Sequence, residues 1–256
     1  MRRLSLFLSL ALLSSAPAAH AIDHGNLDED RPVRIEDAYP VASGEWAAEA
    51  GAGFTLERRR SDRGVFPLEV LYGAYPNLQL GSGTTLSTNP HELDTQSKSG
   101  DLHLSGLYNF NQETLTLPAL GAKLSLNFPT GVDSAGVDVR VKGLATKSIG
   151  RLRVHFNPAY EFLQGTRGGE RDGRYELILG ASYPVGAPTY TRTTLVGDVF
   201  TEQAPRHGDA NIGGVELGFR HQLTPRLVLD VGLGTEFAGP ADRSAFFLTT
   251  GISLAF

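Results

Sequence analysis

The chain has 256 residues, a formal net charge of −5 at pH 7 and no cysteine. An acidic chain has no electrostatic footprint for nucleic acid, and without cysteine it has neither a disulfide framework nor a site for a lipoprotein anchor. With 30 glycines, 14 prolines and 41% hydrophobic residues, the composition suits an all-β protein, whether soluble or embedded in a membrane.

The first 21 residues follow the order of a secretory signal peptide. Arg2 and Arg3 are basic, residues 4–13 are almost wholly apolar, and Ala19 and Ala21 are small residues at the positions that a signal peptidase reads. We therefore expect cleavage after Ala21. Beyond this apolar stretch no run reaches the roughly 18–20 apolar residues that a spanning helix requires. The secreted chain is then either soluble or a barrel.

Residues 22–44 are polar and acidic, and their apolar residues follow no period. We expect this stretch to be a periplasmic N-terminal segment of the domain that follows, residues 45–256. Two alternatives stay open for it. The segment either partly covers or enters that domain, or it is a disordered leader.

From residue 46 onward, apolar and polar residues alternate with the period of two that is typical of β-strands. In the first of these strands Trp46, Ala48 and Phe54 lie on one face and Glu49 on the other. The same pattern predicts twelve strands, within residues 46–57, 68–74, 78–80, 102–110, 120–128, 137–142, 152–162, 175–183, 195–199, 215–220, 227–236 and 246–256.

Short turns and longer loops alternate between these strands, and the longest loops are residues 87–100 and 164–173. An even number of strands places both termini at the end where the short turns lie, as in outer-membrane barrels. A soluble β-sandwich also buries one face of each strand, but it gives no reason for this alternation. We therefore predict an all-β fold, a transmembrane up-and-down antiparallel barrel of about twelve strands. Its apolar face would contact the lipid and lipopolysaccharide of a bacterial outer membrane.

The last strand ends the chain on an aromatic residue. Thr249, Gly251, Leu254 and Phe256 resemble the C-terminal signal of bacterial outer-membrane barrels, in which a polar residue and a glycine precede two hydrophobic residues, the second of them aromatic. A barrel pairs its last strand with its first so that no backbone edge is left unpaired. We expect the barrel-assembly machinery to bind these four residues.

Short motifs along most of the predicted mature chain carry a resemblance to a known family. They are Arg31-Pro32, Glu36-Asp37-Ala38, Gly44-Glu45-Trp46, Leu71-Tyr72-Gly73, Gly100-Asp101-Leu102, Pro129-Thr130-Gly131 and Thr224-Pro225-Arg226-Leu227. With these the chain resembles Gram-negative outer-membrane barrels named as MetA-pathway transporters of phenol degradation. Where that family commonly has a Thr-Asp turn, this chain has Pro76-Asn77. The resemblance implies uptake of aromatic compounds.

Charged residues at the inward positions predict a lumen with opposed walls. Basic residues gather on the fifth to eighth strands, and acidic residues on the first, second, tenth and eleventh, which closure brings together. The residues expected near the constriction are Glu49, Glu69, Lys123, Arg140, Lys142, Arg153, His155 and Glu216. Such walls order polar solutes in porins, so an open channel is one interpretation. The other is that the walls pair with each other and fill a closed, structural barrel.

Other functions have weaker support in the sequence. A lipid-modifying enzyme would need a nucleophile held by a base, and His155 with Asn157 or His103 with Ser105 are the only loose candidates. A surface-interaction protein would need a binding surface, but the longest loops are polar and lack an aromatic cluster. We expect no catalytic residue, no cofactor and no metal site. The sequence thus favours passive uptake of a small-molecule solute.

Overall fold

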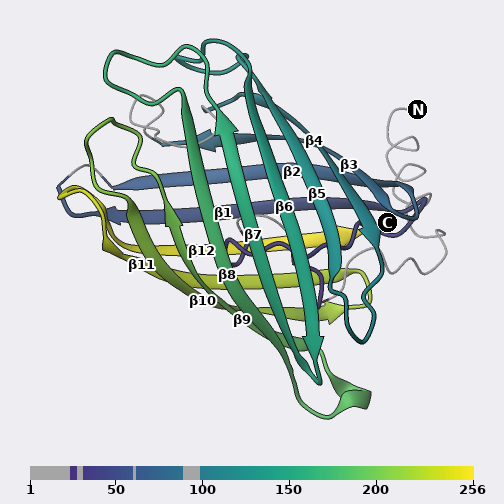
Figure 1. Ribbon diagram of the computed structural model, residues 1–256. Helices are drawn as coiled ribbons and strands as arrows, with labels where there is room; N and C mark the ends of the chain where they lie inside the picture. Colours follow the sequence, from purple (N-terminus) through teal and green to yellow (C-terminus); the bar gives the residue numbers. More distant parts are fainter. Residues whose placement is uncertain (1–23, 28–30, 60–61, 89–98) are drawn as a thin grey trace, which may run out of the picture.

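A computed structural model describes residues 24–27, 31–59, 62–88 and 99–256, so the predicted signal peptide lies outside the described residues. The described chain folds into one closed antiparallel barrel in which each strand pairs with its neighbours in sequence and β1 also pairs with β12 (Figure 1). The strands are β1 (Trp46–Glu57), β2 (Arg63–Tyr75), β3 (Leu78–Ser87), β4 (Leu102–Asn111), β5 (Ala119–Phe128), β6 (Asp138–Ile149), β7 (Leu152–Phe162), β8 (Gly173–Val185), β9 (Thr193–Glu202), β10 (Ile212–Thr224), β11 (Leu227–Ala238) and β12 (Ser244–Ala255). The predicted twelve-stranded barrel is confirmed.

Several strands extend beyond their predicted boundaries, and β3 and β6 each continue seven residues past the predicted end. β6 continues to Ile149, because Lys147 and Ser148 pair with Val154 and Arg153 across the ladder. The sixth strand, predicted to end at residue 142, is therefore seven residues longer at this end. Polar residues at the end of a strand look like a turn in the sequence, yet their backbone groups are satisfied by the neighbouring strand.

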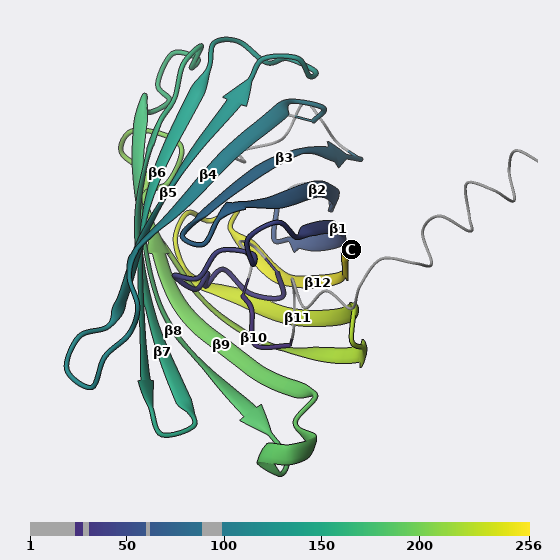
Figure 2. The ribbon, with the colours of Figure 1, turned by 90° about the vertical axis from the view of Figure 1, so that its right-hand side faces the viewer.

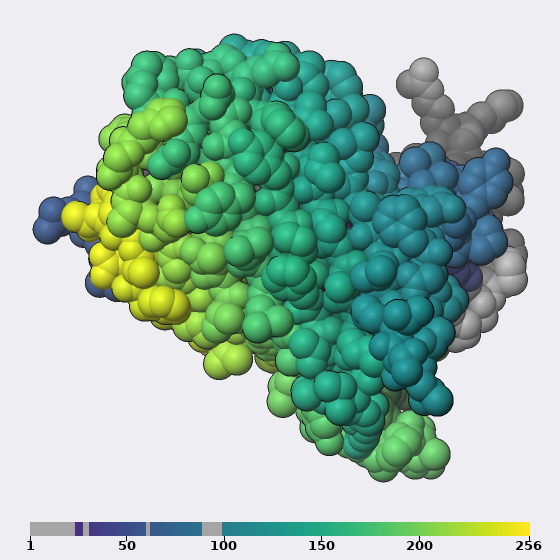
Figure 3. All heavy atoms as spheres, viewed as in Figure 1, coloured from purple at the N-terminus to yellow at the C-terminus, as the bar shows by residue number. Residues whose placement is uncertain are grey.

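Apolar side chains cover the outside of the barrel. Leu124 and Leu179, on the predicted outer face, are about half exposed in the isolated chain, as lipid-facing residues are. Figure 3 shows the side chains of successive strands meeting in a continuous wall on the face in view. The connection from β8 to β9, which holds the short 3-10 helix η2 (Pro188–Tyr190), protrudes at one end (Figure 1). No helix among the described residues is long and apolar enough to cross a membrane.

The barrel closes where the first strand, β1, pairs with the last strand, β12. The backbone N–H of Trp46 donates to the carbonyl of Phe256 at 3.0 Å, and that of Phe256 donates to the carbonyl of Trp46 at 2.9 Å. Eleven residue pairs, from Ala47 with Ala255 to Glu57 with Ser244, continue this seam along β1 and β12. The last strand therefore completes the ladder, and the closed sheet leaves no free edge.

Residues 31–44, called here the lumen segment, enter the barrel: residues 31–41 are buried or half-buried, and residues 42–44 are exposed where the segment leads to β1. Figure 2 shows this purple stretch enclosed by the strands before it leads into β1. Val33, Ile35 and Val41 of the segment are buried, although each precedes the first strand. Of the two possibilities that the sequence left for residues 22–44, the described part thus enters the barrel.

Candidate functional site

The period of two places one set of side chains inside the barrel. All eight residues expected near the constriction occupy inward positions: Glu49 on β1, Glu69 on β2, Lys123 on β5, Arg140 and Lys142 on β6, Arg153 and His155 on β7, and Glu216 on β10. The lumen segment lies between the two walls and contacts both.

Two arginines of the lumen segment face the acidic wall. Arg31 forms an ion pair with Glu49 and places Nη1 3.7 Å from Oδ2 of Asp230. Arg34 contacts three strands at once, with its guanidinium 2.9 Å from Glu176 on β8, 3.3 Å from Glu202 on β9 and 3.1 Å from Glu216 on β10. Its backbone N–H also donates to Glu216 at 2.7 Å, and the guanidinium lies 3.6 Å above the centre of the Phe200 ring.

One carboxylate of the lumen segment faces the basic wall. Glu36 accepts a hydrogen bond from Nζ of Lys123 at 2.8 Å, and its other oxygen lies 3.4 Å from Nζ of Lys142. The backbone of Glu36 is held as well, because its N–H donates to Asn157 at 2.9 Å and its carbonyl accepts from the Asn157 amide at 3.0 Å. The sign of the segment's charge thus changes along its length to match the wall beside it.

Arg140, Glu69 and His155, three of the four remaining predicted residues, have polar partners inside the barrel. Arg140 forms an ion pair with Glu176, and Glu69 accepts a hydrogen bond from Ser105 at 3.4 Å. His155 lies between two hydroxyl groups, with Nδ1 3.2 Å from Thr146 and Nε2 3.0 Å from Ser182. Arg153, two residues before His155, occupies the next inward position of β7.

The histidine pairs suggested by the sequence do not form catalytic arrangements. Asn157 bonds the lumen segment rather than His155, and His155 itself is fully buried. On β4, Nδ1 of His103 lies 2.9 Å from the amide oxygen of Asn127, not beside the Ser105 hydroxyl. A group of three or more residues able to hold a metal ion is not found in the described part of the chain.

Several inward residues are apolar, and sequence reasoning missed them. Ile178, Val196 and Phe200 pack around Leu27, Val33 and Ile35, while Leu107 and Leu144 pack with Ala38, and Leu71 and Val228 with Val41. An apolar residue on the inward face breaks the alternation, as at Ile178 between Leu177 and Leu179. That interruption is the signal that the sequence offered.

Two glycines give the lumen segment room beside the wall. A Cβ atom at Gly232 of β11 would lie 1.9 Å from the carbonyl oxygen of Pro32, and one at Gly73 of β2 would lie 2.0 Å from the carbonyl oxygen of Ala42. No side chain tolerates such a contact with backbone. Glycine is therefore required at both positions for close approach of the segment.

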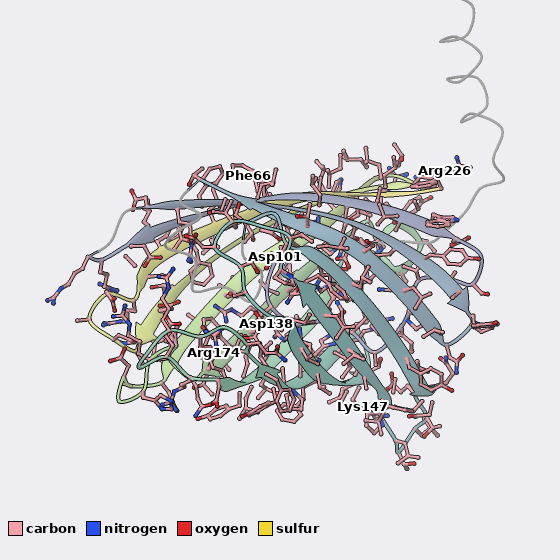
Figure 4. The ribbon with its side chains drawn as sticks, turned by 90° about the horizontal axis from the view of Figure 1, so that it is seen from above. Phe66, Asp101, Asp138, Lys147, Arg174 and Arg226 are labelled. Atoms are coloured by element: carbon pink, nitrogen blue, oxygen red, sulfur yellow. The ribbon has the colours of Figure 1, made fainter. Side chains whose placement is uncertain are left out.

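A cavity of about 440 Å³ lies on the other side of the lumen segment, toward the long loops. Arg31, Pro32 and Arg34 of the segment contribute to its lining, and so do Arg206 and Asp242 from the loops that follow β9 and β11. Charges of both signs surround it. In Figure 4, Arg174, another lining residue, lies toward this end of the barrel, while Lys147 and Arg226 lie toward the end with the short turns.

Comparisons with known proteins point to one class of membrane barrel. A family model described as "Putative MetA-pathway of phenol degradation" matches residues 29–255. No curated protein sequence matches the chain.

Similar solved structures include an outer membrane channel from Pseudomonas putida F1, with 15% identity, coverage of 88% of this chain and 100% of that chain, and a TM-score of 0.65. A NanC porin matches with 10% identity, coverage of 81% and 98%, and a TM-score of 0.61. A KdgM porin solved in complex with disordered oligogalacturonate matches with 9% identity, coverage of 82% and 99%, and a TM-score of 0.55. The chain shares the fold of these channels and porins.

Proposed function

Because the chain belongs to the MetA-pathway phenol-degradation family, whose model covers residues 29–255, we propose that it is an outer-membrane channel for passive uptake of small molecules. The observation that carries this proposal is a cavity of about 440 Å³, lined by both charged and apolar side chains, inside a closed barrel whose outer face is apolar. A barrel of this kind spans the membrane with its lumen screened from lipid. Aromatic compounds are the solutes that the family name suggests.

The cavity supports entry of solute from the side of the long loops. Its lining alternates carboxylates with guanidinium groups, such as Glu161 with Arg174 at 2.9 Å on β7 and β8. Fixed charges of both signs orient a polar or polarisable solute and replace part of its hydration. Transport would then be diffusion along the lumen without cofactor or energy input.

We further propose that the eight predicted residues set ion selectivity. Glu49, Glu69 and Glu216 would favour cations on one side of the passage. Lys123, Arg140, Lys142 and Arg153 would favour anions on the other side, with His155 beside them as a polar group. The support is positional, because all eight lie on the inward face. Assembly through the last strand, including Thr249 and Phe256, and contact with lipopolysaccharide belong to the same proposal.

Single-channel conductance in planar bilayers tests the channel function. The refolded mature chain should show discrete openings, with Lys142→Ala shifting selectivity toward cations and Glu216→Ala shifting it toward anions. Lys147→Ala is a matched control, because Lys147 lies beside a turn and pairs with Glu113 at 3.1 Å. A silent bilayer from every variant, with heat-modifiable migration showing folded barrels, would rule out the channel. Openings with unchanged selectivity would instead exclude Lys142 and Glu216 as residues that set selectivity.

A further inference from the structure

Glu69 and His103 form a polar pair on the cavity wall, apart from the contacts that hold the lumen segment. Glu69 on β2, Gly83 on β3 and His103 on β4 lie opposite one another in neighbouring strands, and Asn127 on β5 continues the row. The first three line the cavity. Because glycine has no side chain, nothing on β3 separates the carboxylate from the imidazole.

Glu69 differs in its partners from two other carboxylates that line the cavity. Glu49, which lies opposite Glu69 across the β1–β2 ladder, pairs with Arg31. Glu161 pairs with Arg174 at 2.9 Å. Among residues 24–27, 31–59, 62–88 and 99–256, no lysine or arginine forms an ion pair with Glu69, whose side chain is 25% exposed. Its negative charge is therefore available to a cationic group of a solute.

The hydrogen bonds around His103 decide which of its nitrogens accepts. Nδ1 lies 2.9 Å from the amide oxygen of Asn127, which only accepts, so Nδ1 carries the proton of the neutral ring. Nε2 then presents a lone pair, 3.9 Å from Oε1 of Glu69. That separation is too long for a hydrogen bond, and neither atom has a proton to donate. Two acceptors thus lie close enough for one donor group beside them to reach both.

A protonated amine matches these two acceptors better than other polar groups do. An ammonium group has three N–H donors and a positive charge, so one nitrogen can donate to Oε1 of Glu69 and to Nε2 of His103 together. A hydroxyl has one proton and satisfies only one of the two. A carboxylate has no proton to donate, and it meets a lining in which ten carboxylates oppose seven guanidinium groups.

Apolar side chains lie next to the polar pair on the same wall. Pro67 and Val65 occupy the inward positions of β2 that follow Glu69 toward the long loops, and both line the cavity. A Cβ at Gly53 of β1 would lie 2.8 Å from Val65, so the valine covers a position without a side chain. The wall therefore offers an apolar face beside the two acceptors.

We propose that Glu69 and His103 form a binding site for the protonated amine of a solute whose apolar body, such as a benzyl ring, packs on Pro67 and Val65. The inference rests on the proposed channel function and narrows its solute class. The amine is held by two hydrogen bonds and not by charge alone. The same ring with a hydroxyl in place of the amine binds more weakly, and with a carboxylate it does not bind.

Isothermal titration of the refolded mature chain with benzylamine tests the site, with empty micelles as the blank. Benzylamine is protonated at neutral pH, while benzyl alcohol and benzoate keep its ring. We expect benzyl alcohol to bind about tenfold more weakly, and benzoate to give no heat. Benzyltrimethylammonium keeps the charge but has no N–H, so it should also bind about tenfold more weakly. Equal affinities for the two cations would overturn the site.

Substitution of one carboxylate at a time separates this pair from the charge of the whole cavity. Glu69→Gln should weaken benzylamine binding by about tenfold or more. Glu202→Gln is the matched control, because it removes the same charge from the same lining at a side chain that is 26% exposed, yet already paired with Arg34. It should change the affinity by less than about threefold. Equal losses in both variants would refute a specific site.

Gly81→Ala tests the geometry without a change of charge. Its Cβ would lie 2.6 Å from Oε1 of Glu69 and also against the Ser105 hydroxyl, so the carboxylate must shift. Benzylamine binding should weaken several-fold, whereas Gly106→Ala, whose Cβ would meet nothing closer than 3.8 Å, should leave it unchanged. Heat-modifiable migration checks that each variant is folded. Bilayer openings without benzylamine binding would refute the site and leave the channel standing. Binding with a silent bilayer would establish the site and refute the channel.

Discussion

Replacing Glu36 by glutamine removes the carboxylate that Lys123 and Lys142 share inside the barrel. The oxygens lie 2.8 and 3.4 Å from the two ammonium nitrogens, and all three side chains are 4% exposed or less. Removing one partner of a buried ion pair typically costs about 3–5 kcal/mol, because the other charge stays buried. Lys142 also interacts electrostatically with Glu176, so we expect the lower end of that range. About 3 kcal/mol shifts the ratio of bound to withdrawn segment by roughly two powers of ten.

Ala38 is fully buried in the lumen segment, so a thiol at this position reacts only when the segment leaves its site. The rate at which a hydrophilic maleimide labels Ala38→Cys in detergent, with and without Glu36→Gln in the same chain, therefore measures that shift. Glu113→Gln is the matched control, because Glu113 also pairs with a lysine, Lys147, but their side chains are 18% and 29% exposed. Partly exposed pairs contribute about 0–1 kcal/mol, and this one lies in the β4–β5 connection, so labelling should stay nearly unchanged. Adding Lys142→Gln to Glu36→Gln should recover part of the loss. If Glu36→Gln labels as slowly as the control, the ion pairs do not hold the segment.

Three further predictions concern the barrel itself. Phe256→Ala should lower assembly in cells several-fold while refolding in detergent changes little, since the backbone bonds to the first strand remain; equal losses in heat-modifiable migration would argue against a role in assembly. Leu124→Arg, in the middle of β5, should lower the free energy of unfolding in lipid vesicles by about 2–4 kcal/mol. Leu115→Arg, at a side chain that is 99% exposed in a turn, should change it by no more than about 0.5 kcal/mol. Similar losses for the two variants would mean that Leu124 does not face lipid. Burial raises the pKa of Glu113, but hydrogen bonds, chiefly those from Ser148, outweigh this effect and hold the pKa below the ordinary value of 4.5. The ionised Glu113 therefore stabilises the fold fully above pH 4.5, and this stabilisation is lost as the pH falls through the lowered pKa. Exchange of the Ser148 amide, corrected for its intrinsic rate, should therefore quicken at acidic pH in the natural chain and show no such dependence in Glu113→Gln.

The sequence was sufficient for the wall of the barrel because a period of two is a local property. Leu102, Leu104 and Tyr108 could be assigned to the outer face from their spacing alone, and the structure exposes all three there. The inward positions of Glu49 and Lys142 followed from the same count. Boundaries were less certain, as at Lys147, because pairing with a neighbour decides where a strand ends.

The contents of the lumen could not be predicted because they depend on contacts across long separations in sequence. Arg34 meets Glu216 from 182 residues away, and the polar stretch that contains Arg34 has no period of its own. Ile178 interrupts the alternation of apolar and polar residues along β8, and only the packing of Ile35 against it explains why. Gly232 likewise resembles any strand glycine until Pro32 lies beside it.

The described residues ahead of β1 begin and end at the mouth of the barrel that carries the short turns, because His24 contacts Thr194 at the start of β9 and Trp46 pairs with Phe256. This arrangement has a consequence for how the protein is made. A segment threaded from one mouth to the other would have to be in place before the seam between β1 and β12 formed. Here the lumen segment is joined to β1 at Trp46, at the mouth where the pairing of β1 with β12 ends. The barrel can therefore close first, and the segment can enter its lumen afterwards. Insertion of the barrel into the membrane and entry of the segment into the lumen are then separate events, and the fold does not require one to precede the other.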